Sequence, residues 1–138
     1  MKTLVRWGFG AIFAAGVAIH LYYGQTQPEG YAAFGETAVP PVDQLWRSFV
    51  MPHIRVLTVA MAAIEAFIAI GLLWQEKLRK PAVITSLAFF GCLIPLGFGW
   101  PTATLTEDFL KNRLGSVLMI LAMAPLLSAS GMGGRATG

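Results

Sequence analysis

Long stretches without charge dominate this chain of 138 residues. The longest of them runs from Pro81 to Thr106 and contains no Asp, Glu, Lys or Arg. One helix of about 20 predominantly apolar residues crosses the hydrocarbon core of a bilayer, and four stretches of this sequence meet that requirement. We therefore predict an all-α fold, a bundle of four transmembrane helices.

The composition agrees with this prediction. Hydrophobic residues make up 56% of the chain, charged residues only 12%, and the mean hydropathy is +0.64, whereas soluble domains contain about 25% charged residues. The net charge of +3 is small and the basic residues are scattered, so nucleic acid is not an expected partner. The single cysteine, Cys92, excludes an internal disulfide and any centre built from paired cysteines.

Four spans and their connections use almost the whole chain, so we predict one membrane domain, residues 1–129. The expected spans are residues 4–23, 52–74, 81–99 and 114–129. Pro95 predicts a kink or a frayed end near the exit of the third span. Residues 130–138 are rich in Gly and Ser, and we expect a flexible tail there because the segment has little apolar area to bury.

The first connection, residues 25–51, is long and polar, and its second half has an amphipathic pattern. The apolar side chains of that half recur at helical spacing, which predicts a short helix lying at the membrane surface. They are Leu45, Trp46, Phe49 and Val50. Asp43 is the expected N-cap of this helix. The second connection, residues 75–80, is short and basic, so the second and third spans are expected to run antiparallel.

The basic residues predict the orientation of the bundle. With four spans, the Lys and Arg residues of the N-terminus, of the second connection and of the C-terminus lie on one side of the membrane. Cytoplasmic loops carry an excess of Lys and Arg. Both termini are therefore expected in the cytoplasm, with the net acidic first connection on the outer face.

Glu65 is the only charged residue between Arg55 and Glu76, which places it near the middle of the second predicted span. An acid at that depth is costly unless it is neutral or has a partner, and burial favours the neutral form. Two interpretations follow. In the first, Glu65 accepts a proton or orients a ligand such as a quinone. In the second, its side chain has only a structural role and forms a hydrogen bond that links two helices.

His20 and His53, the only histidines, are expected near the outer ends of the first and second spans. Two facing imidazoles can ligate a haem iron, so a haem b site is one hypothesis, and packing at the interface is the ordinary alternative. Arg55 lies one turn inside the same boundary. It can extend its charge outward or pair with an acid of the first connection. With two histidines and no matching acidic motif, a catalytic zinc site is not expected.

Small residues recur every four positions along the first predicted helix, at Gly10, Ala14 and Ala18. Small side chains let two helix backbones approach closely. We expect this face to pack inside the bundle rather than to form a dimer.

Two motifs carry a family resemblance. The first span contains, in order, Arg6, Gly10, Phe13, Gly16 and His20. The second contains Ala63-Ile64-Glu65-Ala66 and then Ile70-Gly71-Leu72-Leu73. These patterns resemble the DoxX-like family of small four-helix bacterial membrane proteins, whose first helix has an Arg, spaced Gly and Phe positions and a basic exit residue, and whose second helix has an acid and a Gly-Leu exit. His20 stands where the family more often has Lys.

The resemblance implies a bacterial inner-membrane protein, because family members include subunits associated with thiosulfate and quinone oxidoreduction or with oxidative-stress complexes. We expect an accessory or anchor subunit of a quinone-linked redox complex rather than a self-sufficient enzyme, with membrane lipid and a larger membrane complex as partners. A lipophilic ligand such as a quinone would bind at Glu65, with His20, His53 and Arg55 at the outer mouth of the pocket. Two alternatives stay open: a haem b electron carrier, and a purely structural subunit.

Overall fold

The computed structural model describes residues 2–129, and every regular element in that range is helical. Four helical segments are long and apolar enough to cross a membrane: Lys2–Thr26, Val42–Leu73, Glu76–Leu96 and Leu105–Ser128. The predicted all-α bundle with four candidate spans is therefore confirmed. The predicted flexible tail, residues 130–138, lies outside the described residues.

The elements follow one another with short connections. The first span is α1 (Lys2–Thr26), and the first connection contains η1 (Pro28–Tyr31) and α2 (Ala32–Thr37). The second span joins α3 (Val42–Leu45), η2 (Trp46–Val50), η3 (Met51–His53) and α4 (Ile54–Leu73). The third joins η4 (Glu76–Leu78) and α5 (Arg79–Leu96). The fourth joins α6 (Leu105–Asp108), η5 (Phe109–Arg113), α7 (Leu114–Met123) and α8 (Pro125–Ala129).

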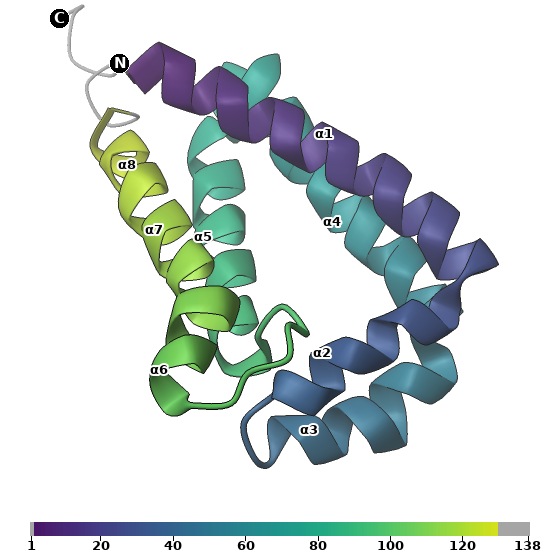
Figure 1. The fold of residues 1–138 in the computed structure, drawn as a ribbon. Helices are drawn as coiled ribbons and strands as arrows, with labels where there is room; N and C mark the ends of the chain where they lie inside the picture. Colours follow the sequence, from purple (N-terminus) through teal and green to yellow (C-terminus); the bar gives the residue numbers. More distant parts are fainter. Residues whose placement is uncertain (1, 130–138) are drawn as a thin grey trace, which may run out of the picture.

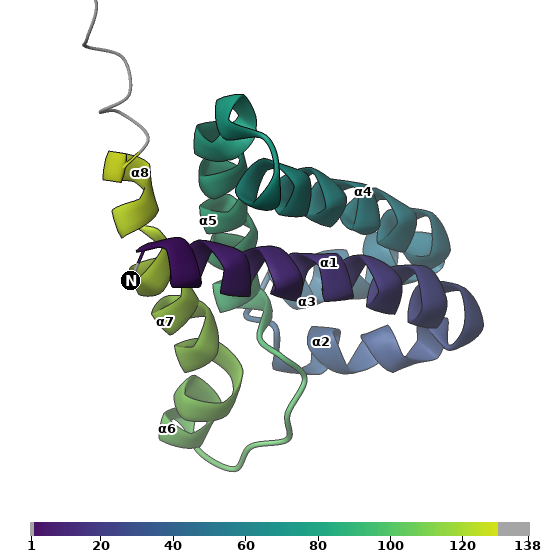
Figure 2. The ribbon, with the colours of Figure 1, turned by 90° about the horizontal axis from the view of Figure 1, so that it is seen from above.

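The helices form two pairs that diverge from one end of the molecule. Figure 1 shows α1 beside α4, and α5 beside α7 and α8. The pairs meet where α1 begins, and they are widest apart at the other end, where α2 and α3 lie between them (Figures 1 and 2). An apolar cavity lies between the two pairs, lined in part by side chains of α1, α4 and α5.

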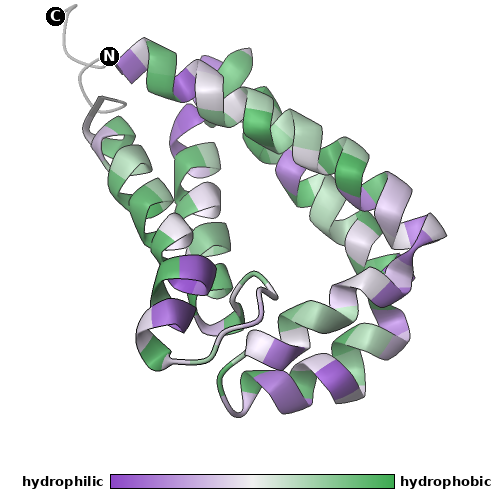
Figure 3. Ribbon diagram, viewed as in Figure 1, coloured by the Kyte–Doolittle hydropathy of each residue, from purple (hydrophilic) through white to green (hydrophobic). Residues whose placement is uncertain are grey.

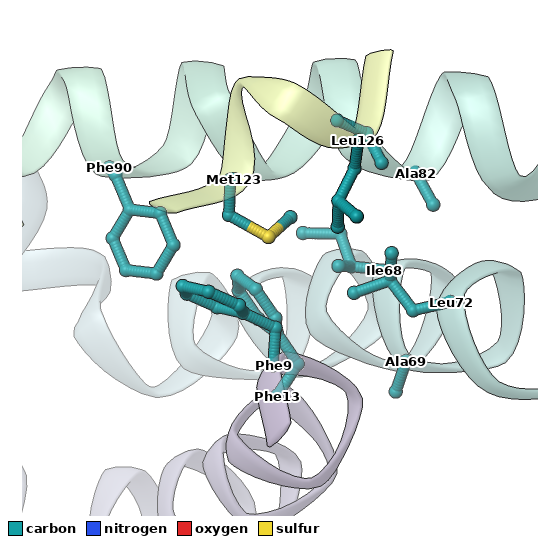
Figure 4. Close-up of a cluster of buried hydrophobic side chains, with 10 residues drawn as sticks. Phe9, Phe13, Ile68, Ala69, Leu72, Ala82, Phe90, Met123 and Leu126 are labelled. Atoms are coloured by element: carbon teal, nitrogen blue, oxygen red, sulfur yellow. The ribbon is translucent and has the colours of Figure 1, made fainter. Parts of the chain in front are cut away.

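The core occupies the end at which the two helix pairs meet, and Figure 4 shows its side chains. It consists of Phe9, Phe13, Ile68, Ala69, Leu72, Ala82, Val83, Phe90, Met123 and Leu126. The rings of Phe9 and Phe90 meet edge to face, 5.9 Å apart. Apolar residues predominate along the four candidate spans (Figure 3). Many of their large side chains are exposed, among them Leu4, Val56 and Leu121, as is expected of helices that are surrounded by lipid.

Glycines of α1 allow its close contact with α4. Gly10 lies against Leu73, Gly16 against Glu65 and Gly24 against Thr58. Of the predicted small-residue face, Gly10 contacts α4, whereas Ala14 and Ala18 are exposed. Four residues span one full helical turn plus about 40°. Residues that recur every four positions therefore lie progressively farther around α1, away from the side that faces α4.

The second helical segment begins at Val42, ten residues before the predicted start of the span at Pro52. The residues of the predicted surface helix form α3 and η2, which lie beside α2 and run in a different direction from α4 (Figure 1). The helical segment continues from them into α4. Pro52 does not interrupt it because the proline lies at the beginning of the 3₁₀ turn η3, where a missing N–H group is tolerated. Asp43 is not the N-cap; Pro41 holds that position, and no side chain caps it.

The ends of the third and fourth spans also differ in detail from expectation. The predicted disturbance near Pro95 takes the form of a helix end, since α5 stops at Leu96 and Gly97 has a φ of +79°. The fourth segment begins at Leu105 rather than at 114. Thr104 caps it by accepting a hydrogen bond from the Glu107 N–H, so a T-x-x-E capping pattern marks this start in the sequence.

Candidate functional site

Glu65 lies on α4 between two helices and is only 4% exposed. Its carboxyl group fits there because the facing residue of α1 is Gly16. A Cβ atom at Gly16 would come within 2.7 Å of the Glu65 carboxyl carbon, which is closer than real Cβ contacts. Because Gly16 has no side chain, α1 leaves room there for the carboxyl group of Glu65.

His20 and Tyr31 extend this acid into a chain of three polar side chains. Because His20 follows Gly16 by one helical turn, it lies on the same face of α1. Its Nε2 atom is 3.6 Å from Glu65 Oε1, which is within ion-pair range but longer than a hydrogen bond. Its Nδ1 atom is 2.7 Å from the Tyr31 hydroxyl. Carboxyl, imidazole and phenol thus stand in a row between α4, α1 and η1.

Residues of the first connection and of the start of the second helical segment hold Tyr31 in place. The Trp46 indole N–H donates a hydrogen bond to the Tyr31 carbonyl, at 2.9 Å. Phe34 lies between these two aromatic side chains: its ring stacks on Tyr31, with ring centres 6.0 Å apart, and is tilted against Trp46, with ring centres 5.9 Å apart. Gly35 makes room for the indole, since a Cβ atom there would lie 2.6 Å from a ring carbon of Trp46. The predicted surface segment therefore faces the bundle at Trp46.

An apolar cavity of about 270 Å³ lies against the three polar side chains. It is positioned where the helix pairs diverge (Figure 1). Its polar lining is Glu65, His20 and Tyr31; the rest is mostly aliphatic and aromatic, from Ile12, Phe13, Gly16, Ile19, Phe34, Trp46, Met61, Phe89, Phe90, Leu93, Leu96 and Phe98. Apolar walls with a few convergent polar groups are typical of small-molecule sites.

One oxygen of the acid has no partner. Glu65 Oε2 is buried and makes no hydrogen bond to any residue from 2 to 129. Buried polar atoms are nearly always paired, and leaving one unpaired costs about 1–3 kcal/mol. Glu65 lines the cavity, so a ligand bound there would lie beside a carboxyl group that has unused hydrogen-bonding capacity.

The protonation of Tyr31 has a consequence for His20. Burial raises the pKa of Tyr31 above its ordinary value, and the negative charge of Glu65 raises it further. Tyr31 therefore keeps its proton at neutral pH and can donate it in a hydrogen bond to His20 Nδ1. A neutral imidazole then carries its own proton on Nε2, the nitrogen nearest Glu65.

His53 and Arg55 do not join this site. Both are exposed and line a second hollow with Pro28 and Glu29. The His53 Nδ1 atom lies 2.8 Å from the Phe49 carbonyl. The Arg55 side chain makes no ion pair within residues 2–129. Their expected place at the mouth beside His20 is taken by Tyr31 and Trp46.

The two histidines therefore line different hollows, His20 in the bundle and His53 at its surface. This arrangement gives no support to a haem held between them. In the part of the chain that the structure describes, no cluster of three or more His, Cys, Asp or Glu side chains could hold a metal ion.

The sequence analysis did not predict a polar network that holds the segment around Phe98, a residue that lines the cavity. Asn112 is fully buried; its Oδ1 accepts from the Trp100 N–H at 2.9 Å, and its Nδ2 donates to the Trp100 carbonyl at 3.0 Å. Arg113 donates to Asp108 at 2.7 Å and to the Thr37 carbonyl at 2.8 Å. These bonds tie α2 and the segment around Phe98 to the fourth span.

Comparison with known proteins finds no match. No family model matches the chain. No curated protein and no solved structure matches it significantly either. The similarity to the DoxX-like family therefore stays a prediction, based on the motifs of the first two spans.

Proposed function

We propose that this protein binds a lipophilic ligand with a polar ring headgroup, of the quinone class, in the cavity beside Glu65. The observation that carries the proposal is the buried, unpartnered Oε2 of Glu65 at an apolar cavity. A long-chain ligand can enter such a cavity from the lipid phase, and its polar end would form a hydrogen bond with the carboxyl group of Glu65.

The chemistry of the site suits both forms of a quinone. A quinone carbonyl accepts hydrogen bonds, and a quinol hydroxyl also donates them. A neutral Glu65 donates and an ionised Glu65 accepts, while the imidazole of His20 can do either. Phe34, Phe89 and Phe98 offer flat apolar surfaces against which a ring can stack.

Location and partners are part of the same proposal. We place the protein in a bacterial inner membrane, with both termini in the cytoplasm, as an accessory subunit of a quinone-linked redox complex. The orientation is supported by the cations Lys2, Arg6 and Arg79, which line one hollow at the end where α1 begins, because cytoplasmic ends of spans are rich in Lys and Arg. The resemblance to the DoxX-like family supports the accessory role.

Trp46 provides a direct test, because it lines the cavity. The purified protein in detergent micelles is titrated with a benzoquinone that carries a decyl chain, and tryptophan fluorescence is recorded. We expect saturable quenching that Trp46→Phe removes, and a dissociation constant about tenfold higher for Glu65→Gln, since a buried hydrogen bond is altered. Glu76→Gln, a change at an exposed acid, is the matched control and should bind as the wild type does.

The alternatives predict different results. If Glu65 were only a structural link, Glu65→Gln would bind the quinone as tightly as the wild type. If the protein were a haem carrier, the purified protein would show a Soret band that His20→Ala and His53→Ala each abolish. Either result would replace the proposal made above.

A further inference from the structure

A third hollow, of about 150 Å³, lies at the end of the molecule where α1 begins. Its lining is Lys2, Thr3, Arg6, Arg79 and Leu126. Three of these five residues are cationic, and none is acidic. The hollow is far along α1 from the cavity at Glu65, and the inference drawn from it does not depend on the proposed quinone site.

The positive charges of this hollow are poorly balanced. Lys2 and Arg6 lie one turn apart on α1, and like charges at that spacing repel. Arg6 forms no ion pair within residues 2–129; its guanidinium carbon lies 5.9 Å from the ring centre of Trp7. Arg79 pairs at 3.2 Å with Glu76, whose side chain is 84% exposed.

Two guanidinium nitrogens of the residues that line the hollow have no acceptor within the described residues. The Nε atoms of Arg6 and Arg79 are both inaccessible to solvent and have no hydrogen-bond partner among the described residues. A buried donor without an acceptor is costly. An anion in the hollow would offset the repulsion among the cations and would accept hydrogen bonds from both guanidinium groups.

The N-terminus of α1 favours an anion at the same place. This helix begins at this end of the molecule (Figures 1 and 2), at Lys2. The N–H groups of a first helical turn are unpaired, and the helix dipole is positive there. The unpaired N–H groups and the helix dipole thus attract an anion in addition to the charged side chains.

We propose that this hollow binds the phosphate group of an anionic phospholipid. Guanidinium groups match the geometry of phosphate oxygens, and Thr3 adds a hydroxyl. The hollow lies at the ends of spans, the depth at which lipid headgroups are found, and basic pockets between helices on the cytoplasmic side are suited to such headgroups. Leu4, next to Thr3 and 78% exposed, offers an apolar surface to the acyl chains.

Native mass spectrometry of the full-length protein in detergent tests the proposal. Phosphatidylglycerol and phosphatidylcholine are added separately, and bound lipid is counted. We expect the wild type to retain phosphatidylglycerol preferentially, and the double variant Arg6→Gln/Arg79→Gln to bind it about tenfold more weakly, because each cation near a headgroup contributes to the attraction. The matched control is Arg47→Gln/Lys77→Gln, which removes two exposed cations that do not line the hollow.

Equal weakening in both double variants would overturn the proposal, because it would indicate a non-specific attraction of lipid to positive charge. A second experiment compares inorganic phosphate with phosphatidylglycerol by thermal unfolding. If both raised the unfolding temperature equally, the hollow would bind phosphate without needing a lipid, and the proposal of a lipid site would be wrong. If the double variant does not retain its helical circular dichroism spectrum, Arg6→Gln and Arg79→Gln are compared singly with Lys77→Gln by the same measurements and criteria.

Discussion

Gly16 of α1 lies directly against the carboxyl group of Glu65 of α4, so closely that a Cβ atom at position 16 would be 2.7 Å from the carboxyl carbon. The pair explains how a bundle in lipid accommodates an acid between two helices: one helix supplies the carboxyl group and the other supplies the space. The same glycine directs Glu65 toward His20 and the apolar cavity.

Gly16→Ala should displace the Glu65 carboxyl group while leaving the fold intact. The clashing atoms are at the end of a flexible side chain, and alanine favours a helix by about 1 kcal/mol relative to glycine. We expect near wild-type thermal stability and weaker quenching of Trp46 by the decyl benzoquinone. Gly8→Ala on the same helix is the control, since no atom lies within 4 Å of its added Cβ. Identical quinone affinities in the two variants would contradict the role given to Gly16.

Glu65→Leu should stabilise the protein. The change removes a buried oxygen that has no hydrogen-bond partner in residues 2–129, and leucine has a similar volume. Burying a polar atom that has no hydrogen-bond partner is costly, so removing it should raise the free energy of unfolding by about 1–3 kcal/mol. Denaturant-induced unfolding of the purified protein measures it. A loss of stability would show instead that Glu65 is a structural link.

Tyr31 should ionise at higher pH than the other tyrosines. Its pKa is raised from 10.0 by burial and by the charge of Glu65, so Tyr31 stabilises the fold below pH 10 and this contribution is lost as the pH rises through the raised pKa. Tyrosinate absorbance near 295 nm should show a late step that Tyr31→Phe removes and Tyr22→Phe retains. In Glu65→Gln that step should move to lower pH, and an unchanged step would contradict the coupling.

Asn112→Ala should destabilise the fold by about 2–4 kcal/mol, because it removes the partner of three part-buried backbone groups, the N–H of Phe98 and the N–H and carbonyl of Trp100. The Asn112 amide bonds to both the N–H and the carbonyl of Trp100. Thr106→Ala, an exposed change in the same helical segment, should have little effect. Thermal unfolding followed by circular dichroism compares the two. Equal stabilities would mean that the network around Asn112 does not hold the segment that carries Phe98.

Part of the site was accessible from the sequence, and the reason is energetic. Glu65 could be found because an acid inside a long apolar stretch is costly wherever the helices lie. Tyr31 and Trp46 could not be found, because aromatic residues in a polar connection occur as often at a membrane surface as in a binding site. The start of the fourth helical segment could have been found from Thr104 and Glu107, whose spacing is that of a capping pair.

The residues that His20 contacts depend on how α1 is rotated about its own axis. Sequence position suggested His53 as its partner, since both were expected near the outer boundary. Which face of α1 meets α4 is set by the contacts of Gly16 and Gly24, and these turn His20 toward Glu65 and Tyr31. His53 is exposed at the surface instead.

What the amino-acid order alone determined is the number, approximate length and apolar character of the spans, because the hydrophobic and hydrogen-bonding requirements of a bilayer act on each segment separately. Only the tertiary structure decided which polar groups meet, where the cavity lies and which oxygen stays without a partner. Those properties depend on the rotation and divergence of whole helices, and these follow from contacts between residues far apart in the chain.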